Sequence, residues 1–131
     1  MKIGITAGAF DLCHAGHVVL FREAKRYCDH LIIALHIDPS RERKYKKKPV
    51  MTASERYLIL YSNEDVDEII PYETEAEYEE MLLLLKPDVR FVGSDWKEKE
   101  SEITAKDAVP IVFIERRHHQ SSTNIRERLK K

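Results

Sequence analysis

Residues 3–17 read IGITAGAFDLCHAGH and contain a short apolar run, a turn rich in small residues and the start of a helical pattern. The run at 3–7 has the length of a buried strand. In α/β proteins, ligands bind beside the carboxyl ends of the strands, where such a turn lies. Gly8 and Gly16 let the backbone approach a ligand, and a helix beginning near Gly16 presents unpaired N–H groups with partial positive charge. The segment 8–17 therefore predicts a phosphate-binding turn.

Two histidines of this turn are three residues apart. If the chain is helical there, the imidazoles of His14 and His17 lie on one side of the first turn and can hold one anion together. A pair of histidines can also be structural or form half of a metal site, but two ligands are too few for a closed zinc centre. The flanking glycines, strand and helix favour the phosphate interpretation.

The two cysteines, Cys13 and Cys28, lack the spacing of a zinc site and the density of a secreted disulfide scaffold. Cys13 adjoins His14, but adjacent residues seldom face each other in a helix or turn. A free cysteine usually behaves as a small buried hydrophobic residue. We therefore expect two reduced thiols without a catalytic role.

Apolar runs of strand length recur along the chain, at 3–7, 31–35, 66–70, 89–92 and 111–114. Helical spacing appears at 18–27, 57–61 and 75–85, and a capping box from Thr52 to Glu55 marks the start of the middle helix. Strands that alternate with helices imply parallel pairing through right-handed crossovers. We predict a single α/β domain over 1–131, a Rossmann-like, doubly wound, five-stranded parallel sheet with helices on both faces.

Composition limits the class of protein. The 131 residues are 43% hydrophobic and 34% charged, which is the balance of a globular domain with its own core. The 22 basic and 23 acidic side chains nearly cancel, so the overall charge gives no reason to expect nucleic-acid or membrane binding. The sequence contains neither an apolar run of membrane-spanning length nor a secretory signal, and we expect a cytoplasmic protein.

Two polar segments interrupt the pattern of strands and helices. The loop at 41–48 holds a dense group of basic side chains, which is either a solvated surface or a phosphate site. Its basic members are Arg41, Arg43, Lys44, Lys46, Lys47 and Lys48. The segment 116–125, RRHHQSSTNI, opens the last helix with three hydroxyls. One hydroxyl suffices as a helix cap, whereas three beside exposed amides also form an anion site.

These motifs together carry a resemblance to a known family. GAFDLCHAGH resembles the HxGH signature of the cytidylyltransferase-like nucleotidyltransferases, and 116–125 is similar to their RTEGISTTxI element. The chain most resembles the bacterial glycerol-3-phosphate cytidylyltransferases, over nearly its whole length. The resemblance implies transfer of CMP from CTP to a small phosphorylated alcohol, with glycerol 3-phosphate favoured and pyrophosphate released. It also implies Mg²⁺ bound mainly through the nucleotide phosphates, and a homodimer.

The resemblance assigns roles to individual positions, with no protein-bound metal among them. The implied catalytic residues, which contact the reacting phosphates, are His14, His17, Lys44 and Arg116. The implied acceptor and phosphate contacts are Lys44, Lys46 and the helix-borne Arg56. The implied nucleotide contacts are Gly8, Ala9, Phe10, His14, Gly16, His17, Ser94, Arg116, Ser121, Ser122 and Thr123.

Such a reaction depends on charge stabilisation. The attacking phosphate oxygen is already ionised at neutral pH, so it needs no general base, and alignment and neutralisation of charge supply the catalysis. Imidazoles, lysines, arginines and helix-start amides meet this need. The sequence has no obvious nucleophile paired with a base, which argues against a covalent intermediate.

Some positions depart from the family pattern. Ser94 replaces an aspartate, which leaves the base open and keeps an adenylyltransferase of the same superfamily, making an FAD-like or ADP-sugar product, as the alternative. Thr74 and Glu75 replace an asparagine-tryptophan pair, so the acceptor can be another small phosphate or phosphonate. A nucleotide-binding regulatory protein that has lost turnover is the alternative from another class.

Four side chains keep more than one interpretation. Asp11 can coordinate Mg²⁺ or cap the turn, and we favour the turn. Trp96 can shape the nucleotide pocket, a subunit contact or the core. His118 and His119 are either phosphate contacts or exposed loop residues, and we favour exposure.

Overall fold

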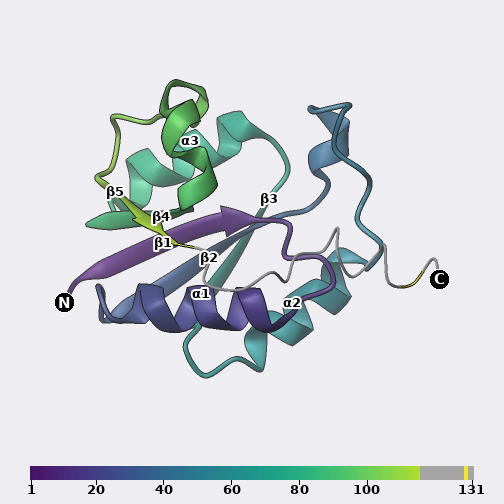
Figure 1. Ribbon diagram of the computed structural model, residues 1–131, viewed down its shortest axis with the longest axis horizontal. Coiled ribbons are helices and arrows are strands. Elements are labelled where there is room, and N and C mark those ends of the chain that lie inside the picture. Colours follow the sequence, from purple (N-terminus) through teal and green to yellow (C-terminus); the bar gives the residue numbers. More distant parts are fainter. Residues whose placement is uncertain (116–128, 130–131) are drawn as a thin grey trace.

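The computed structural model describes residues 1–115 and residue 129. Five parallel strands form one sheet in the order β3-β2-β1-β4-β5 (Figure 1). The strands are β1 (Ile3–Gly8), β2 (His30–His36), β3 (Glu68–Tyr72), β4 (Val89–Gly93) and β5 (Ile111–Ile114). The strand order reverses between β1 and β4, which is the place where doubly wound sheets bind their ligands.

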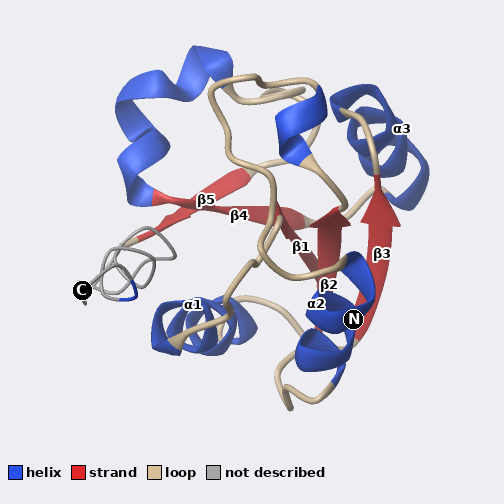
Figure 2. Cartoon of the chain, turned by 90° about the vertical axis from the view of Figure 1, so that its right-hand side faces the viewer, coloured by secondary structure: helices blue, strands red, loops and turns tan. Residues whose placement is uncertain are grey.

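Helices cover both faces of this sheet. The helices α1 (Ala15–Lys25) and α2 (Ala53–Tyr61) lie on one face, and α3 (Glu75–Leu85) and the 3₁₀ segment η2 (Ser94–Glu102) lie on the other (Figures 1 and 2). A short 3₁₀ turn, η1 (Pro39–Arg41), follows β2. This architecture confirms the predicted Rossmann-like fold.

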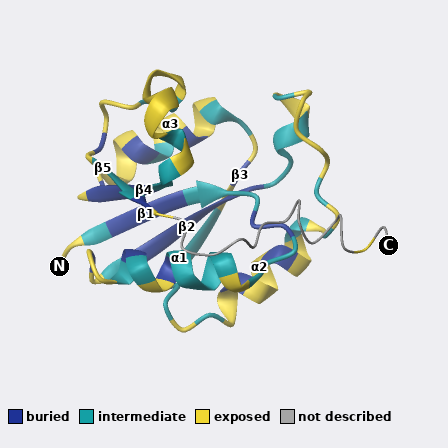
Figure 3. Ribbon diagram, in the orientation of Figure 1, coloured by how far each residue is buried: buried dark blue, intermediate teal, exposed yellow. Residues whose placement is uncertain are grey.

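Two hydrophobic clusters fill the layers on either side of the sheet (Figure 3). Phe21 of α1 and Leu60 of α2 belong to one cluster, and Tyr78 and Leu82 of α3 belong to the other. Every residue of β2 from 31 to 36 is buried. A strand covered on both faces needs apolar side chains on both, which explains its continuous apolar run.

The helix starts follow their capping residues. Thr52 Oγ1 accepts the N–H of Glu55 at 3.1 Å, and Glu55 Oε1 accepts the N–H of Thr52 at 2.9 Å. This reciprocal pair of hydrogen bonds is the predicted capping box, and α2 begins at Ala53, directly after the capping residue Thr52. Thr74 caps α3 in a similar way, because its hydroxyl accepts the N–H of Glu77 at 3.1 Å.

Two elements differ from the prediction. The third strand begins two residues later than predicted, because the Asp67 carboxylate accepts the N–H of Leu31 at 2.8 Å just before the regular ladder starts. Pro71 lies inside β3, which is tolerated because β3 is an edge strand. The segment η2 was not predicted, since SDWKEKESE has no apolar periodicity.

Candidate active site

A cavity of about 720 Å³ opens at the carboxyl ends of β1 and β4. It therefore lies at the reversal of strand order, where the sequence predicts a phosphate site. The predicted residues that line it are Gly8, Ala9, Phe10, His14, Gly16, His17 and Lys46. Other lining residues include Arg43, Lys47 and Trp96.

His14 and His17 lie side by side at the start of α1. His14 is the N-cap residue, and its Nδ1 accepts the N–H of Gly16 at 3.0 Å. The Nδ1 of His17 accepts the N–H of His14 at 3.3 Å, and the two rings stack with centroids 4.0 Å apart. A neutral imidazole that accepts at Nδ1 carries its proton on Nε2. Each ring thus caps the helix with one nitrogen and holds a donor on the other.

Phe10 packs against this pair. Its backbone has a positive φ of 49°, and its buried ring lies edge-on to His17 at 5.4 Å and to Phe21 at 5.3 Å. A Cβ added at Gly8 would come within 3.3 Å of the same ring. The turn therefore folds back onto the core, and Phe10 fixes the position of the His17 ring.

Asp11 ties the turn to the segment before α2. Its carboxylate oxygens accept the N–H groups of Val50 at 2.8 Å and Met51 at 3.0 Å, and the side chain is buried. These contacts agree with a role in holding the turn.

Arg56, for which the family resemblance implies a phosphate contact, is buried beside the site. It is 2% exposed and is not among the described residues that line the cavity. Its guanidinium donates to the carbonyls of Ala9, His36, Ile37 and Met51, at distances of 2.5 to 3.1 Å. These carbonyl groups belong to residues at or just after the ends of β1 and β2, or just before α2. Buried carbonyl groups need hydrogen-bond donors, and Arg56 supplies them. Arg56 thus joins the loops around the site, and the phosphate contact that the resemblance implies stays a prediction.

The remaining predictions in the described residues divide between the cavity and the surface. Lys46 lines the cavity, whereas Lys44 is exposed and does not. Ser94 is half-buried and does not line the cavity, whereas the next two residues, Asp95 and Trp96, do. A Cβ at Gly93 would lie 2.5 Å from Oδ1 of the exposed Asp95, so a larger residue here would require that side chain to turn aside.

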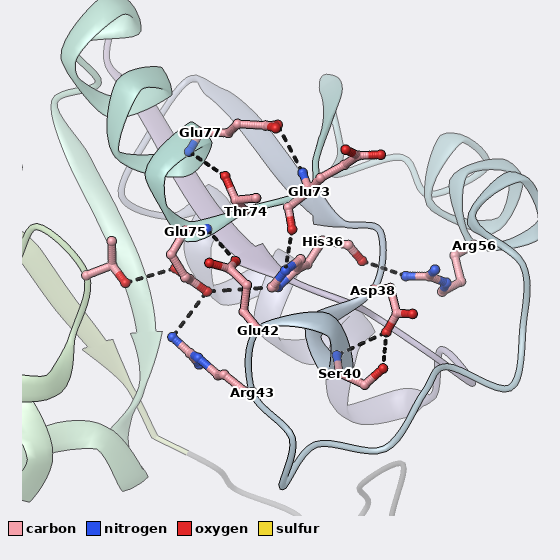
Figure 4. A network of polar contacts seen from close by, with 11 residues as sticks. His36, Asp38, Ser40, Glu42, Arg43, Arg56, Glu73, Thr74, Glu75 and Glu77 are labelled. Atoms are coloured by element: carbon pink, nitrogen blue, oxygen red, sulfur yellow. Dashed lines mark hydrogen bonds and ion pairs between the residues drawn. The ribbon is translucent and has the colours of Figure 1, made fainter.

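Glu75 is the centre of a polar network at the other side of the cavity (Figure 4). Its carboxylate lies 3.1 Å from Arg43 Nη2 and 4.0 Å from His36 Nδ1, and it accepts the hydroxyl of Thr104 at 2.8 Å. Its backbone N–H donates to Glu42 at 2.8 Å. The residue that departs from the family pattern therefore joins the end of β2, the basic loop and the segment after η2.

Aromatic rings and a buried cation continue the wall beyond Glu75. The His36 ring stacks on Tyr72 at 4.5 Å, and Tyr72 stacks on Tyr78 at 5.2 Å. Burial lowers the pKa of His36 and raises that of Tyr72. Arg90, on β4, lines the same cavity. Sequence reasoning missed these residues, although an arginine inside the apolar run VRFV was a usable signal.

The two cysteines are free thiols, as predicted. Burial raises the pKa of both Cys13 and Cys28, which favours the neutral thiol over the reactive thiolate. Cys28 belongs to the hydrophobic core. Neither thiol has the environment of a catalytic nucleophile.

Several predicted residues lie outside the described part of the chain: Arg116, His118, His119, Ser121, Ser122 and Thr123. Within residues 1–115 and 129, no group of three or more His, Cys, Asp or Glu side chains is arranged to hold a metal ion. In the same residues, no helix has the length and apolar character needed to cross a membrane.

Comparison with solved structures supports the fold. The lipopolysaccharide core biosynthesis protein from Thermoplasma volcanium GSS1 superposes with a TM-score of 0.70 at 23% identity, over 92% of this chain and 99% of that chain. Pantothenate synthetase from Thermus thermophilus gives a TM-score of 0.65 at 15% identity, over 99% of this chain and 64% of that chain.

Comparison of sequences identifies relatives and the family. Glycerol-3-phosphate cytidylyltransferase of Bacillus subtilis (strain 168) is 34% identical over 129 residues, which cover 98% of each chain. The bifunctional protein HldE of Aliarcobacter butzleri (strain RM4018) is 39% identical over 100 residues, 76% of this chain but 21% of that protein. The cytidylyltransferase-like family model matches residues 5–128. The chain therefore belongs to the cytidylyltransferase-like family of nucleotidyltransferases.

Proposed function

We propose that this chain is a cytidylyltransferase that transfers CMP from CTP to a small phosphorylated alcohol, with glycerol 3-phosphate the first acceptor to test. The observation that carries the proposal is the stacked pair of His14 and His17 at the start of α1, inside a cavity at the strand reversal. Support also comes from the Bacillus subtilis relative, which bears that name and matches this chain end to end.

The proposed reaction is a displacement at the α-phosphorus of CTP. A phosphate oxygen of the acceptor forms a bond to this phosphorus while the bond to the bridging oxygen breaks, and pyrophosphate leaves with that oxygen. The acceptor oxygen is already ionised, so no side chain has to remove a proton. The task of the protein is to align the two phosphates and to stabilise the added negative charge.

The histidine pair is suited to that task. Each ring uses Nδ1 to accept a backbone N–H, so the tautomer that donates at Nε2 is fixed before the ligand arrives. The helix N-terminus adds partial positive charge at the same place. Donors that are oriented in advance need no reorganisation as charge develops on the α-phosphate oxygens. We assign His14 and His17 this role.

Basic side chains would neutralise the other phosphates. Lys46 lies on the cavity wall, and Lys44 is close to it in the same loop. On the strength of the family resemblance, we assign neutralisation of the reacting phosphates to Arg116 together with the lysines, and the β- and γ-phosphates to Ser121, Ser122 and Thr123. Mg²⁺ would enter with the nucleotide and be held mainly by its phosphate oxygens, where it supplies further charge neutralisation.

Pyrophosphate release tests the proposal. The purified protein is incubated with Mg²⁺, each of CTP, ATP, GTP and UTP, and a panel of small phosphates and phosphonates that includes glycerol 3-phosphate. Release with CTP and a phosphorylated alcohol supports the proposal. Release with ATP alone supports the adenylyltransferase alternative, which Ser94 leaves open. Binding of nucleotide without release from any pair supports a regulatory protein, and thermal shifts with the four triphosphates identify the base in that case.

We also propose that the protein forms a homodimer through α2. Tyr57, Leu58 and Tyr61 on this helix are 39%, 67% and 71% exposed, and neighbouring apolar side chains on a surface favour an interface. The mass of the protein in solution tests this. A twofold mass that falls to that of the monomer in Leu58→Lys and not in Leu83→Lys, on α3, supports the proposed face. A monomer at micromolar concentration contradicts it.

A further inference from the structure

Arg90 is a buried cation, and the described residues around it provide no anionic partner that would explain its burial. It lies in β4 and is 1% exposed, and its three guanidinium nitrogens have no well-aligned hydrogen-bond acceptor among the described residues, where the neutral Tyr78 hydroxyl is the polar group beside them. Other buried arginines in proteins are paired, as Arg56 is with four carbonyls here. A charge removed from water without compensation is costly. The desolvation cost of burying Arg90 would be offset if a bound ligand supplied an anionic acceptor.

The position of Arg90 separates it from the histidine pair. Arg90 is opposite Ile5 in the ladder, and Ile5 belongs to the hydrophobic cluster on the α3 face of the sheet. His14 and His17 start α1, which covers the other face. Arg90 also lies three residues before the end of β4, roughly 10 Å deeper along the strand. One cavity includes both places, so a single ligand can extend from one to the other.

The surroundings of Arg90 indicate which anion it would hold. The polar neighbour is Tyr78: burial raises the pKa of its hydroxyl, while the Arg90 charge and a hydrogen-bonding contact with the Arg90 side chain lower it. A neutral hydroxyl leaves the positive charge of Arg90 uncompensated. Glu75, on the same helix, already places a carboxylate in this part of the cavity. Beside the Glu75 carboxylate, a monoanion suffers less repulsion than a dianionic phosphate does. A carboxylate also matches the planar guanidinium with two parallel hydrogen bonds.

We propose that Arg90 binds a carboxylate on the acceptor substrate, so that the acceptor is a phosphorylated hydroxy acid whose phosphate reacts at the histidine pair. The inference rests on the proposed function, because it takes the ligand of this pocket to be the second substrate. The guanidinium is nearly closed to bulk solvent, but Arg90 and Tyr78 both line the cavity through which the carboxylate would reach it. Glycerol 3-phosphate carries a hydroxymethyl group where 3-phosphoglycerate carries a carboxylate, which makes these two compounds a matched pair.

Binding measurements with this pair test the inference without turnover. Isothermal titration of the wild-type protein, with the nonreactive CTP analogue CMPCPP and Mg²⁺ present, should give a dissociation constant for 3-phosphoglycerate roughly tenfold or more below that for glycerol 3-phosphate. Arg90→Met should abolish the preference, and Arg90→Lys should keep part of it. The matched control is Arg22→Met, at an exposed position on α1, which should keep the whole preference.

Stability provides a second readout. An unpaired buried cation should cost stability, so Arg90→Met should melt at the same temperature as the wild type or higher. A lower melting temperature would mean that the guanidinium is already satisfied in the free protein, and would overturn the inference. Equal affinities of the wild type for the two acceptors, or a preference that survives in Arg90→Met, would also overturn it. Absence of pyrophosphate release together with an Arg90-dependent preference would refute the proposed nucleotidyl transfer alone.

Discussion

The ring of His17 accepts the backbone N–H of His14 through Nδ1, while the ring of His14 accepts the N–H of Gly16 through its own Nδ1. The two imidazoles therefore serve as helix caps as well as candidate phosphate ligands. Capping uses one nitrogen of each ring, and the proposed chemistry uses the other. The two roles can be separated by substitution.

His14→Asn should separate them. Asparagine is among the best N-cap residues, so the free energy of unfolding should stay within about 0.5 kcal/mol of the wild type. Turnover should fall by about 10²- to 10³-fold, because an oriented donor to the transition state is lost. Urea denaturation and pyrophosphate release measure the two quantities.

His14→Ala is the control for the cap. It should lose a similar amount of turnover and, in addition, about 1 kcal/mol of stability. A His14→Asn protein with near-normal turnover would show that His14 is only a cap.

His17→Ala should lower turnover by about 10²-fold or more and leave the fold intact. The ring packs on Phe10 at the cavity wall, outside the main cluster of buried residues, so its loss creates no closed core cavity. Circular dichroism and a melting curve check the fold, and single-turnover release of pyrophosphate checks the chemistry. An almost unchanged rate would remove His17 from the proposed mechanism.

Arg56→Lys should act on stability first. A lysine has too few donors and the wrong geometry for four carbonyls, so buried acceptors are left unpaired and the free energy of unfolding should fall by about 3 kcal/mol. Urea denaturation measures the change. The same substitution at the exposed Arg41 should have almost no effect. A variant of normal stability with a raised KM for a phosphate substrate would instead support the role implied by the family resemblance.

Arg56 also marks the boundary of what the sequence can predict. Strand and helix positions follow from local apolar spacing and from caps such as Thr52, so the parallel sheet and the turn at Gly8 are accessible to sequence reasoning. The partners of Arg56 lie up to 47 positions away and are backbone carbonyls, which leave no pattern in the sequence. Glu75 is visible as a departure from the family pattern, but its contacts with Arg43 and Thr104 depend on how distant loops meet.

His36 should make stability depend on pH. Burial lowers its pKa in the folded protein, although Glu75 opposes the change, whereas the unfolded chain has the ordinary value near 6.5. Between these two values the unfolded chain binds a proton that the folded protein does not. The stabilisation of the folded protein by neutral His36 is therefore fully present above about pH 6.5, and it is lost as the pH falls toward the lowered pKa of the folded state.

Urea denaturation of the wild type and of His36→Gln between about pH 5 and pH 8 measures this contribution. Glutamine keeps a donor for the carbonyl of Glu73, which His36 Nε2 contacts at 3.2 Å, but it does not titrate. The difference in unfolding free energy between the two proteins should be constant above about pH 7, and the wild type should lose its relative advantage below about pH 6.5. Other titrating groups are common to both proteins and cancel in the difference. Parallel pH profiles would mean that the ring takes up its proton equally well in the folded state, and that Glu75, 4.0 Å from Nδ1, stabilises the imidazolium enough to offset burial.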